Sequence, residues 1–180
     1  MARWEPILEQ VMRERAPRLL AYAAMLTGDD AEAHDVVQDA LVRSFSRGRR
    51  FDHVNAAEAY VRRAIGSVVI DRSRKRRTVP RDPSVHAQQA APASDRNAAM
   101  DVRRALRELG PRERTCIVLR FCDDLTVPQI AARLNLADGT VKRYLSDASA
   151  RLAEILGTDV EWNDGPSVVR VVTRARHGRN

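Results

Sequence analysis

The chain has 180 residues and a formal net charge of +7, with 31 Lys and Arg against 24 Asp and Glu. This length allows one large domain or two small ones, and a basic chain favours a polyanionic partner, nucleic acid before membrane. Apolar runs fall short of the ~18 residues of a membrane span and no signal-peptide pattern opens the chain, so we expect no membrane span and a cytoplasmic location.

Residues 1–77 are helical in pattern. An apolar run at 19–26 ends at Gly28, and the acids that follow at 29–32 suit the positive end of a new helix. Apolar side chains then recur at intervals of three and four, which predicts a helix of about four turns. This stripe consists of Ala33, Val36, Val37, Ala40, Leu41, Ser44 and Phe45.

After a break at 47–55, another helix is predicted from about Ala56. It ends in a basic run, in which five of the six residues at 72–77 are Lys or Arg. Such a run is typical of contacts to a phosphate backbone, which give affinity and salt dependence but no choice of sequence. Residues 78–97 then contain three prolines and almost no large apolar side chains, and this composition predicts a flexible linker.

Helical periodicity returns at 98–156. Within it, residues 126–152 read as two short amphipathic helices joined by a tight turn, the layout of a helix-turn-helix whose second helix enters the DNA major groove. Thr126 and Gln129 predict a capping box at the start of the first helix, because the Gln side chain can reach back to the Thr amide. The alternative without a DNA-binding function is a solvated helical hairpin with scattered charge.

The sequence therefore predicts an all-α protein of two small helical domains, at 1–77 and 98–156, joined by the flexible linker at 78–97. A C-terminal extension, 157–180, follows. Its Val168–Val172 run is compatible with a short strand, with docking on a partner or with a disordered basic tail, and these alternatives stay open.

Side chains that carry chemistry are sparse. The two cysteines, Cys116 and Cys122, cannot form a disulfide framework and fit no common zinc spacing, so we expect both to be small buried hydrophobes. The four histidines are scattered, and the eight glycines form no phosphate-binding loop. We therefore expect no metal, no cofactor and no enzymatic activity.

Three segments together resemble bacterial sigma factors of the extracytoplasmic-function group. They are Ala33–Ala40, Ala59–Arg72, and a third that runs from Ala105 to Phe121 and resumes at Thr126–Leu152. The resemblance covers roughly 16–77, which is similar to the domain called sigma-two, and 98–156, which is similar to sigma-four. It implies a dissociable RNA polymerase subunit that recognises −10 and −35 promoter elements, and an anti-sigma factor as regulator.

The resemblance also implies roles for individual residues. Binding of core RNA polymerase falls on an acidic helix face, Asp35, Gln38 and Asp39. Contacts to the −10 DNA fall on Phe51, His53, Asn55, Arg62, Arg63, Ser67, Arg72, Arg74, Lys75 and Arg76. Contacts to the −35 DNA fall on Arg133, Gly139, Thr140, Lys142, Arg143 and Ser146, without a choice between Lys142 and Arg143 as the reader of bases.

Two positions depart from the family pattern. Ser67 stands where the family commonly has Asn, which leaves that −10 contact in question. Ala137 stands where the family favours Ser at the start of the recognition helix, and Ala cannot cap a helix. Asp138 is then the candidate cap, which would shift the helix start by one residue.

Two other functions are compatible with parts of the sequence. An ordinary helix-turn-helix repressor or activator explains residues 126–152 equally well, but it leaves the acidic helix and the basic run at 72–77 without a role. A DNA recombinase with a helix-turn-helix tail would need a nucleophile and base, or metal ligands, and we find no such constellation.

Overall fold

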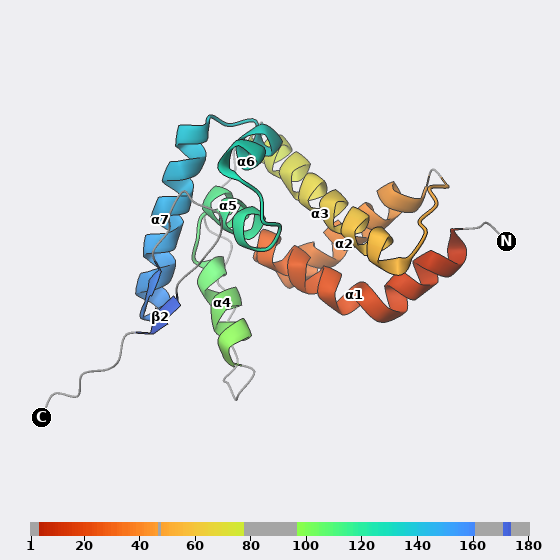
Figure 1. The fold of residues 1–180 in the computed structure, drawn as a ribbon, viewed down its shortest axis with the longest axis horizontal. Coiled ribbons are helices and arrows are strands. Elements are labelled where there is room, and N and C mark those ends of the chain that lie inside the picture. Colours follow the sequence, from red (N-terminus) through yellow and green to blue (C-terminus); the bar gives the residue numbers. More distant parts are fainter. Residues whose placement is uncertain (1–3, 47, 78–96, 161–170, 174–180) are drawn as a thin grey trace, which may run out of the picture. The chain divides into compact units, whose positions relative to one another are not determined.

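The computed structural model describes residues 4–46, 48–77, 97–160 and 171–173. They belong to two compact units, Met1–Pro92 and Ala93–Asn180 (Figure 1). Apart from Asn97, the linker predicted at 78–97 lies outside the described residues. Within the described residues, no helix is long and apolar enough to cross a membrane.

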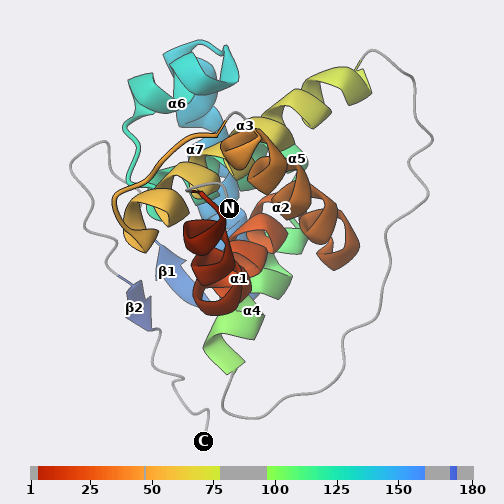
Figure 2. The same ribbon diagram turned by 90° about the vertical axis from the view of Figure 1, so that its right-hand side faces the viewer.

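The first unit is a bundle of three helices, each of which packs against the other two (Figure 2). These are α1 (Glu5–Thr27), α2 (Asp30–Phe45) and α3 (Val54–Arg77). Helix α1 ends at Gly28, whose positive φ of 76° is a conformation that glycine adopts without strain. Side chains from all three helices form the core, among them Leu19, Tyr22, Val36, Val61 and Ile65.

The apolar stripe and the acidic start predicted for α2 are both confirmed. Ala33, Val36 and Ala40 are at most 1% exposed. The Asp29 carboxylate accepts a hydrogen bond of 2.7 Å from the Glu32 amide and so caps the helix. Helix α3 begins at Val54, two residues before the predicted start.

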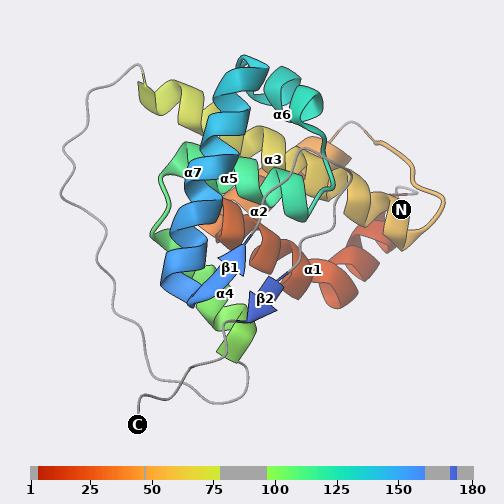
Figure 3. The same ribbon diagram turned by 60° about the vertical axis from the view of Figure 1, so that its left-hand side comes forward.

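The second unit is built around one long helix, α7 (Asp138–Leu156). The other helices are α4 (Asn97–Arg107), α5 (Pro111–Phe121) and α6 (Val127–Leu134). All three pack directly on α7 or on one another, with α6 beside its N-terminal end (Figure 3). The core that they enclose is apolar and includes Leu119, Ile130, Val141 and Leu145.

Two short strands follow α7. Strand β1 (Thr158–Val160) pairs antiparallel with β2 (Val171–Thr173), with Asp159 opposite Val172. Of the alternatives for the valine-rich run, the described residues Val171 and Val172 thus adopt the strand. The all-α prediction is confirmed, with this pair of antiparallel strands following α7.

The predicted helix-turn-helix is α6 and α7. The Gln129 side chain accepts a hydrogen bond of 2.8 Å from the Thr126 amide, as the capping box predicts. Asn135 ends α6 in the left-handed conformation, with φ 53°. The expectation that Asp138 caps α7 is wrong: Ala137 is the N-cap residue and makes no side-chain hydrogen bond, and Asp138 is the first helical residue.

Candidate nucleic-acid interface

The outer face of α2 carries an exposed polar stripe. Asp35, Gln38 and Asp39 are all exposed, because the buried stripe of the same helix occupies the opposite side. Val42, three residues beyond Asp39, is 60% exposed and continues the face with an apolar side chain. The sequence pattern does not single out Val42, since a lone valine within a polar helix face reads as neither core nor interface.

Two ion pairs connect this face of α2 to α3. The Asp39 carboxylate lies 2.6 Å from a guanidinium nitrogen of Arg72, and the Asp71 carboxylate lies 3.0 Å from one of Arg43. Asp39 was expected to bind polymerase and Arg72 to bind DNA. The structure brings the two together, so the two expected surfaces are adjacent and share a contact.

Aromatic rings form a chain beside the loop between α2 and α3. The ring centroids of Phe45 and Phe51 are 5.4 Å apart, and those of Phe51 and Tyr60 are 5.5 Å apart. Trp4, next to the start of α1, extends the chain, with its centroid 6.3 Å from that of Phe45. Phe45 is buried, whereas Phe51 and Tyr60 are only half-buried. The rings of Phe51 and Tyr60 therefore present exposed aromatic surface next to the loop.

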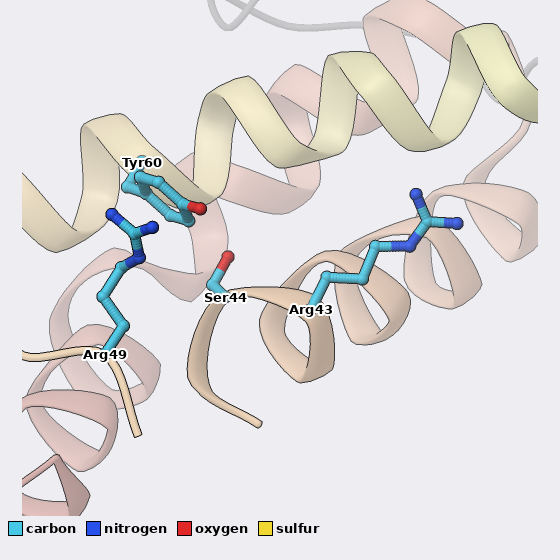
Figure 4. Close-up of a pocket in the computed structure, with 4 residues that line it drawn as sticks. All are labelled: Arg43, Ser44, Arg49 and Tyr60. Atoms are coloured by element: carbon cyan, nitrogen blue, oxygen red, sulfur yellow. The ribbon is translucent and has the colours of Figure 1, made fainter. Parts of the chain in front are cut away.

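A pocket of about 300 Å³ opens beside this surface, lined by Arg43, Ser44, Arg49 and Tyr60 (Figure 4). The Arg49 guanidinium lies 4.4 Å from the centre of the Tyr60 ring, and that of Arg63 lies 5.9 Å from it. Arg43 points away from Tyr60 in Figure 4, and its guanidinium forms the ion pair with Asp71. Arg49 was not predicted as a site residue; its position two residues before Phe51 is the only sequence signal for it.

His53 and Asn55, which the resemblance assigns to −10 DNA, make contacts within their own unit. His53 Nδ1 accepts a hydrogen bond of 3.1 Å from the Ala56 amide and thereby caps the start of α3. Asn55 Oδ1 accepts one of 3.0 Å from Arg15, which also forms an ion pair with Glu58 at 3.1 Å. Both side chains thus anchor the first turn of α3.

The remaining −10 candidates lie on different faces of α3. The Arg62 guanidinium stacks 4.3 Å from the ring centre of the buried Tyr22, so it packs toward the bundle. Arg63 and Ser67 are exposed one turn apart, and the Ser67 hydroxyl donates to the Arg63 carbonyl at 3.1 Å. Arg74 and Lys75 are exposed near the end of the helix, and the Arg76 side chain lies outside the described residues.

The recognition helix α7 has a clear division of faces. Val141, Leu145 and Ala148 are fully buried, whereas Gly139, Lys142, Arg143 and Ser146 are exposed and Thr140 is half-buried. A Cβ atom built on Gly139 would meet no atom within 4 Å, so the packing of this unit does not require glycine there. The exposed side of the helix thus presents the cationic side chains of Lys142 and Arg143 beside Gly139 and Ser146.

Arg133, the −35 candidate on α6, is placed differently. Its guanidinium lies 3.8 Å from the Asp123 carboxylate, and only 21% of its side chain is exposed. It therefore links α6 to the segment after α5, beside the recognition helix rather than on it.

The two cysteines differ in their surroundings. Cys116 is fully buried in α5, and burial raises the pKa of its thiol to about 12, with the nearby Arg112 guanidinium opposing the rise. The expectation of a buried hydrophobe is confirmed for Cys116, but Cys122 is only half-buried. The described residues contain no group of three or more His, Cys, Asp or Glu placed to hold a metal ion.

Comparison with known proteins matches both units. The model of sigma-70 region 2 matches residues 11–79, and that of sigma-70 region 4 matches residues 99–152. The RNA polymerase sigma-E factor of Streptomyces coelicolor is 35% identical over 153 residues, which are 82% of this chain and 85% of that protein. The ECF RNA polymerase sigma factor SigL of Mycobacterium tuberculosis is 33% identical, over 77% of this chain and 82% of that protein.

A solved structure also resembles this chain. It is the sigma factor RpoE of Bartonella quintana, crystallised in complex with the anti-sigma factor NepR. The two chains superpose with a TM-score of 0.56 and are 25% identical, over 86% of this chain and 94% of that one.

Proposed function

The chain belongs to the sigma-70 family, in its extracytoplasmic-function group, and we propose that it directs core RNA polymerase to promoters by recognising −10 and −35 elements. The observation that carries this proposal is the presence of regions 2 and 4, in that order, in one chain. A sigma factor needs no catalytic group of its own, because the polymerase forms the RNA. Its place of action is then the cytoplasm, where a bacterial polymerase transcribes.

The polymerase-binding face in this proposal is the outer side of α2. Asp35, Gln38 and Asp39 present carboxylate and amide oxygens that can accept hydrogen bonds from arginines of a partner helix. Val42 supplies the apolar part of the same face, since an exposed valine gains free energy when a partner removes it from water.

We assign the pocket beside Tyr60 to an unpaired base of the −10 element. Single-stranded bases are held by stacking on aromatic rings and by hydrogen bonds to their edges. Tyr60 offers the ring and Arg49 offers guanidinium donors at the pocket wall. Phe51 packs against Tyr60 in a tilted arrangement, with the ring centroids 5.5 Å apart. His53 and Asn55 hold the start of α3 in place. The DNA strand then runs along α3, where it contacts the side chains of Arg63, Ser67, Arg72, Arg74 and Lys75.

We assign the −35 element to the exposed face of α7. Lys142 and Arg143 are cationic side chains on this face that can donate to guanine edges or to phosphates. Thr140 and Ser146 add hydroxyl groups, and Gly139 allows close approach of the backbone. Arg133 contributes through its link to Asp123, which fixes α6 beside the recognition helix.

Control by an anti-sigma factor is part of the proposal. The support is that the Bartonella sigma factor, which resembles this chain over most of its length, was crystallised with such an inhibitor. An inhibitor of this kind would have to cover the face of α2 or the face of α7 to block the proposed activity.

The test is transcription in vitro with purified core polymerase and a library of genomic promoter fragments. If this chain is a sigma factor, the polymerase will make RNA with defined 5′ ends only when the chain is added. An ordinary helix-turn-helix regulator would bind duplex DNA but would neither form a stable complex with core polymerase nor start transcription. That result would reject the proposed function.

A further inference from the structure

Trp4 occupies a position whose local preference it does not meet. It is the N-cap residue of α1, where Ser, Thr, Asp or Asn normally supplies an acceptor, and its side chain makes no capping hydrogen bond. Its backbone still begins the helix, because the Trp4 carbonyl accepts a hydrogen bond of 3.0 Å from the Leu8 amide. The helix therefore does not account for the large indole ring, and the role of this ring has to come from tertiary contacts.

The indole is the first ring of an aromatic series that ends at the base pocket. Its centroid lies 6.3 Å from that of Phe45, and the next two steps, to Phe51 and then to Tyr60, are 5.4 and 5.5 Å. All three distances fall within the range of about 4.5–7 Å in which aromatic pairs attract each other beyond simple burial. The series thus connects the start of α1 with the end of α2, the loop and α3.

The middle of the loop between α2 and α3 depends on these ring contacts. At its start the Gly48 amide donates to the Phe45 carbonyl at 3.0 Å, and at its end the His53 carbonyl accepts from the first turn of α3. Within the described part of the chain, segment 49–52 makes no hydrogen bond from backbone to backbone. Phe51 is the half-buried side chain of this segment, and the other three are exposed. The Phe51 ring therefore fixes the middle of the loop.

We propose that Trp4 is a positioning residue for the −10 base, and that it acts through Phe45 and Phe51 on the pocket wall at Tyr60. This wall consists of the Tyr60 ring and the Arg49 guanidinium, which lies 4.4 Å from the ring centre (Figure 4). Both groups depend on the loop, because Arg49 belongs to it and Phe51 packs against Tyr60.

The physical effect is preorganisation. The Phe45 ring is only 3% exposed, and the half-buried indole packs on it from the start of α1. Without the indole, Phe45 and the loop gain freedom, which the protein must give up again when a base binds. The inference rests on the proposed function for the identity of the ligand, whereas the hold of Trp4 on the loop rests on the ring contacts alone.

The expected effect is moderate, because Trp4 acts through other rings and not on the base itself. One aromatic pair changes an equilibrium by about two- to tenfold beyond the effect of burial. Trp4→Leu removes the pair with Phe45 but keeps an apolar side chain, and Trp4→Phe keeps a ring at the same position. The comparison of these two variants therefore separates the aromatic contact from simple burial.

The first experiment tests the loop in the free full-length protein. Trypsin cleaves after arginine, and Arg49 and Arg50 are exposed in the loop. Trp4→Leu should raise the cleavage rate at these two positions about two- to tenfold, because the loop opens more often, and Trp4→Phe should stay near the rate of the unmodified protein. Mass spectrometry of the fragments identifies the cleaved bonds.

Val11→Ala is the matched control for this experiment. It removes fully buried packing from α1 about two turns beyond Trp4, and its aliphatic side chain is not part of the aromatic series. An unchanged cleavage rate in Trp4→Leu, or an equal rise in Val11→Ala, would overturn the proposal. Thermal unfolding of each variant, followed by circular dichroism, verifies that the fold is kept.

The second experiment measures binding of a forked promoter fragment by the complex with core polymerase. Trp4→Leu should weaken this binding about two- to tenfold, and Trp4→Phe should restore most of it. In a Tyr60→Leu background, Trp4→Leu should cause no further loss, because the ring through which it acts is absent. Additive losses in the double variant would show that Trp4 does not act through Tyr60 and would overturn the positioning role.

The two experiments separate failure of this inference from failure of the proposed function. If the complex of the unmodified protein with polymerase does not bind the forked fragment, the proposed function fails. The cleavage rates at Arg49 and Arg50 still decide, in that case, whether Trp4 holds the loop.

Discussion

The carboxylate of Asp39 and the guanidinium of Arg72 form an ion pair between α2 and α3, across 33 positions of sequence. The face that we assign to polymerase and the helix that we assign to the −10 strand are thus in direct contact. Substitutions on one surface will affect the other unless they avoid this pair.

Val42→Ala should weaken binding of core polymerase about tenfold while leaving thermal stability nearly unchanged. The substitution removes two carbon atoms, and each apolar carbon buried at an interface contributes about 0.8 kcal/mol. The fold loses little, since Val42 is 60% exposed in the free protein. Met12→Ala is the control, because Met12 is 47% exposed and belongs to α1 rather than to α2. Equal polymerase affinity of both variants would place the interface elsewhere.

Tyr60→Leu should reduce −10 binding by about 1–3 kcal/mol, the contribution of one stacked base, and Tyr60→Phe should retain most of the affinity. Phenylalanine keeps the aromatic ring that packs against the Arg49 guanidinium and the Phe51 ring, whereas leucine loses it. The measurement is binding of a forked promoter fragment by the polymerase complex. Were Tyr60→Phe as defective as Tyr60→Leu, stacking would not be the role of this residue.

Arg143→Ala and Lys142→Ala should each weaken −35 duplex binding and leave polymerase binding intact. If a residue reads a base, its loss relaxes specificity at one position at about 1–3 kcal/mol; if it binds phosphate, its loss lowers affinity for all sequences and reduces the salt slope by about 1. Competition between promoter duplexes at several salt concentrations separates the two roles. Arg104→Ala, on the exposed side of α4, is the control for charge, and an equal effect of it would argue against the assigned face.

The sequence predicted those elements whose signal is local. The stripe through Val36 and Ala40 and the acids before it define α2, because helical periodicity and capping need only neighbours in the chain. The local signal for α1 is weaker before Leu19, where the helix buries only Val11. The capping box at Gln129 was predicted for the same reason as α2.

Relationships between distant segments were beyond the sequence. The partner of Asp39 lies on another helix, and nothing around Asp39 indicates it. Likewise, the resemblance assigns both Arg62 and Arg63 to −10 DNA, yet consecutive helical residues point about 100° apart, and Arg62 stacks on Tyr22. The sequence also gives no sign that the His53 ring caps α3. Side-chain roles in this site depend on tertiary packing that only the structure gives.

Ala137→Ser should stabilise the second unit by about 0.5–2 kcal/mol, because a serine at the N-cap accepts a hydrogen bond from an otherwise unpaired backbone amide. Ala137 is the N-cap residue of α7 and supplies no such acceptor. Ala150→Ser, at an exposed position inside α7, is the control and should be slightly destabilising, since serine is a poorer helix former than alanine. Urea unfolding of both variants tests this, and no gain for Ala137→Ser would mean that the start of α7 is already satisfied.

The buried thiol of Cys116 predicts a loss of stability in alkali. Its pKa is raised from 9.0 to about 12 by burial, so the folded protein keeps the proton while the unfolded chain releases it above pH 9. A raised pKa of this kind stabilises the fold fully below pH 9, and the contribution is lost as the pH rises from 9 toward 12.

Cys116→Ala lowers the free energy of unfolding at every pH, because it leaves a cavity. It also removes the thiol's contribution to the fall of that free energy with pH. Cys122→Ala is the control, because Cys122 is only half-buried. The free energy of unfolding, measured in urea between pH 8 and about pH 10.5, should fall less steeply for Cys116→Ala than for Cys122→Ala. Parallel slopes would show that the thiol ionises in the folded protein, and its burial would then contribute nothing to the pH dependence.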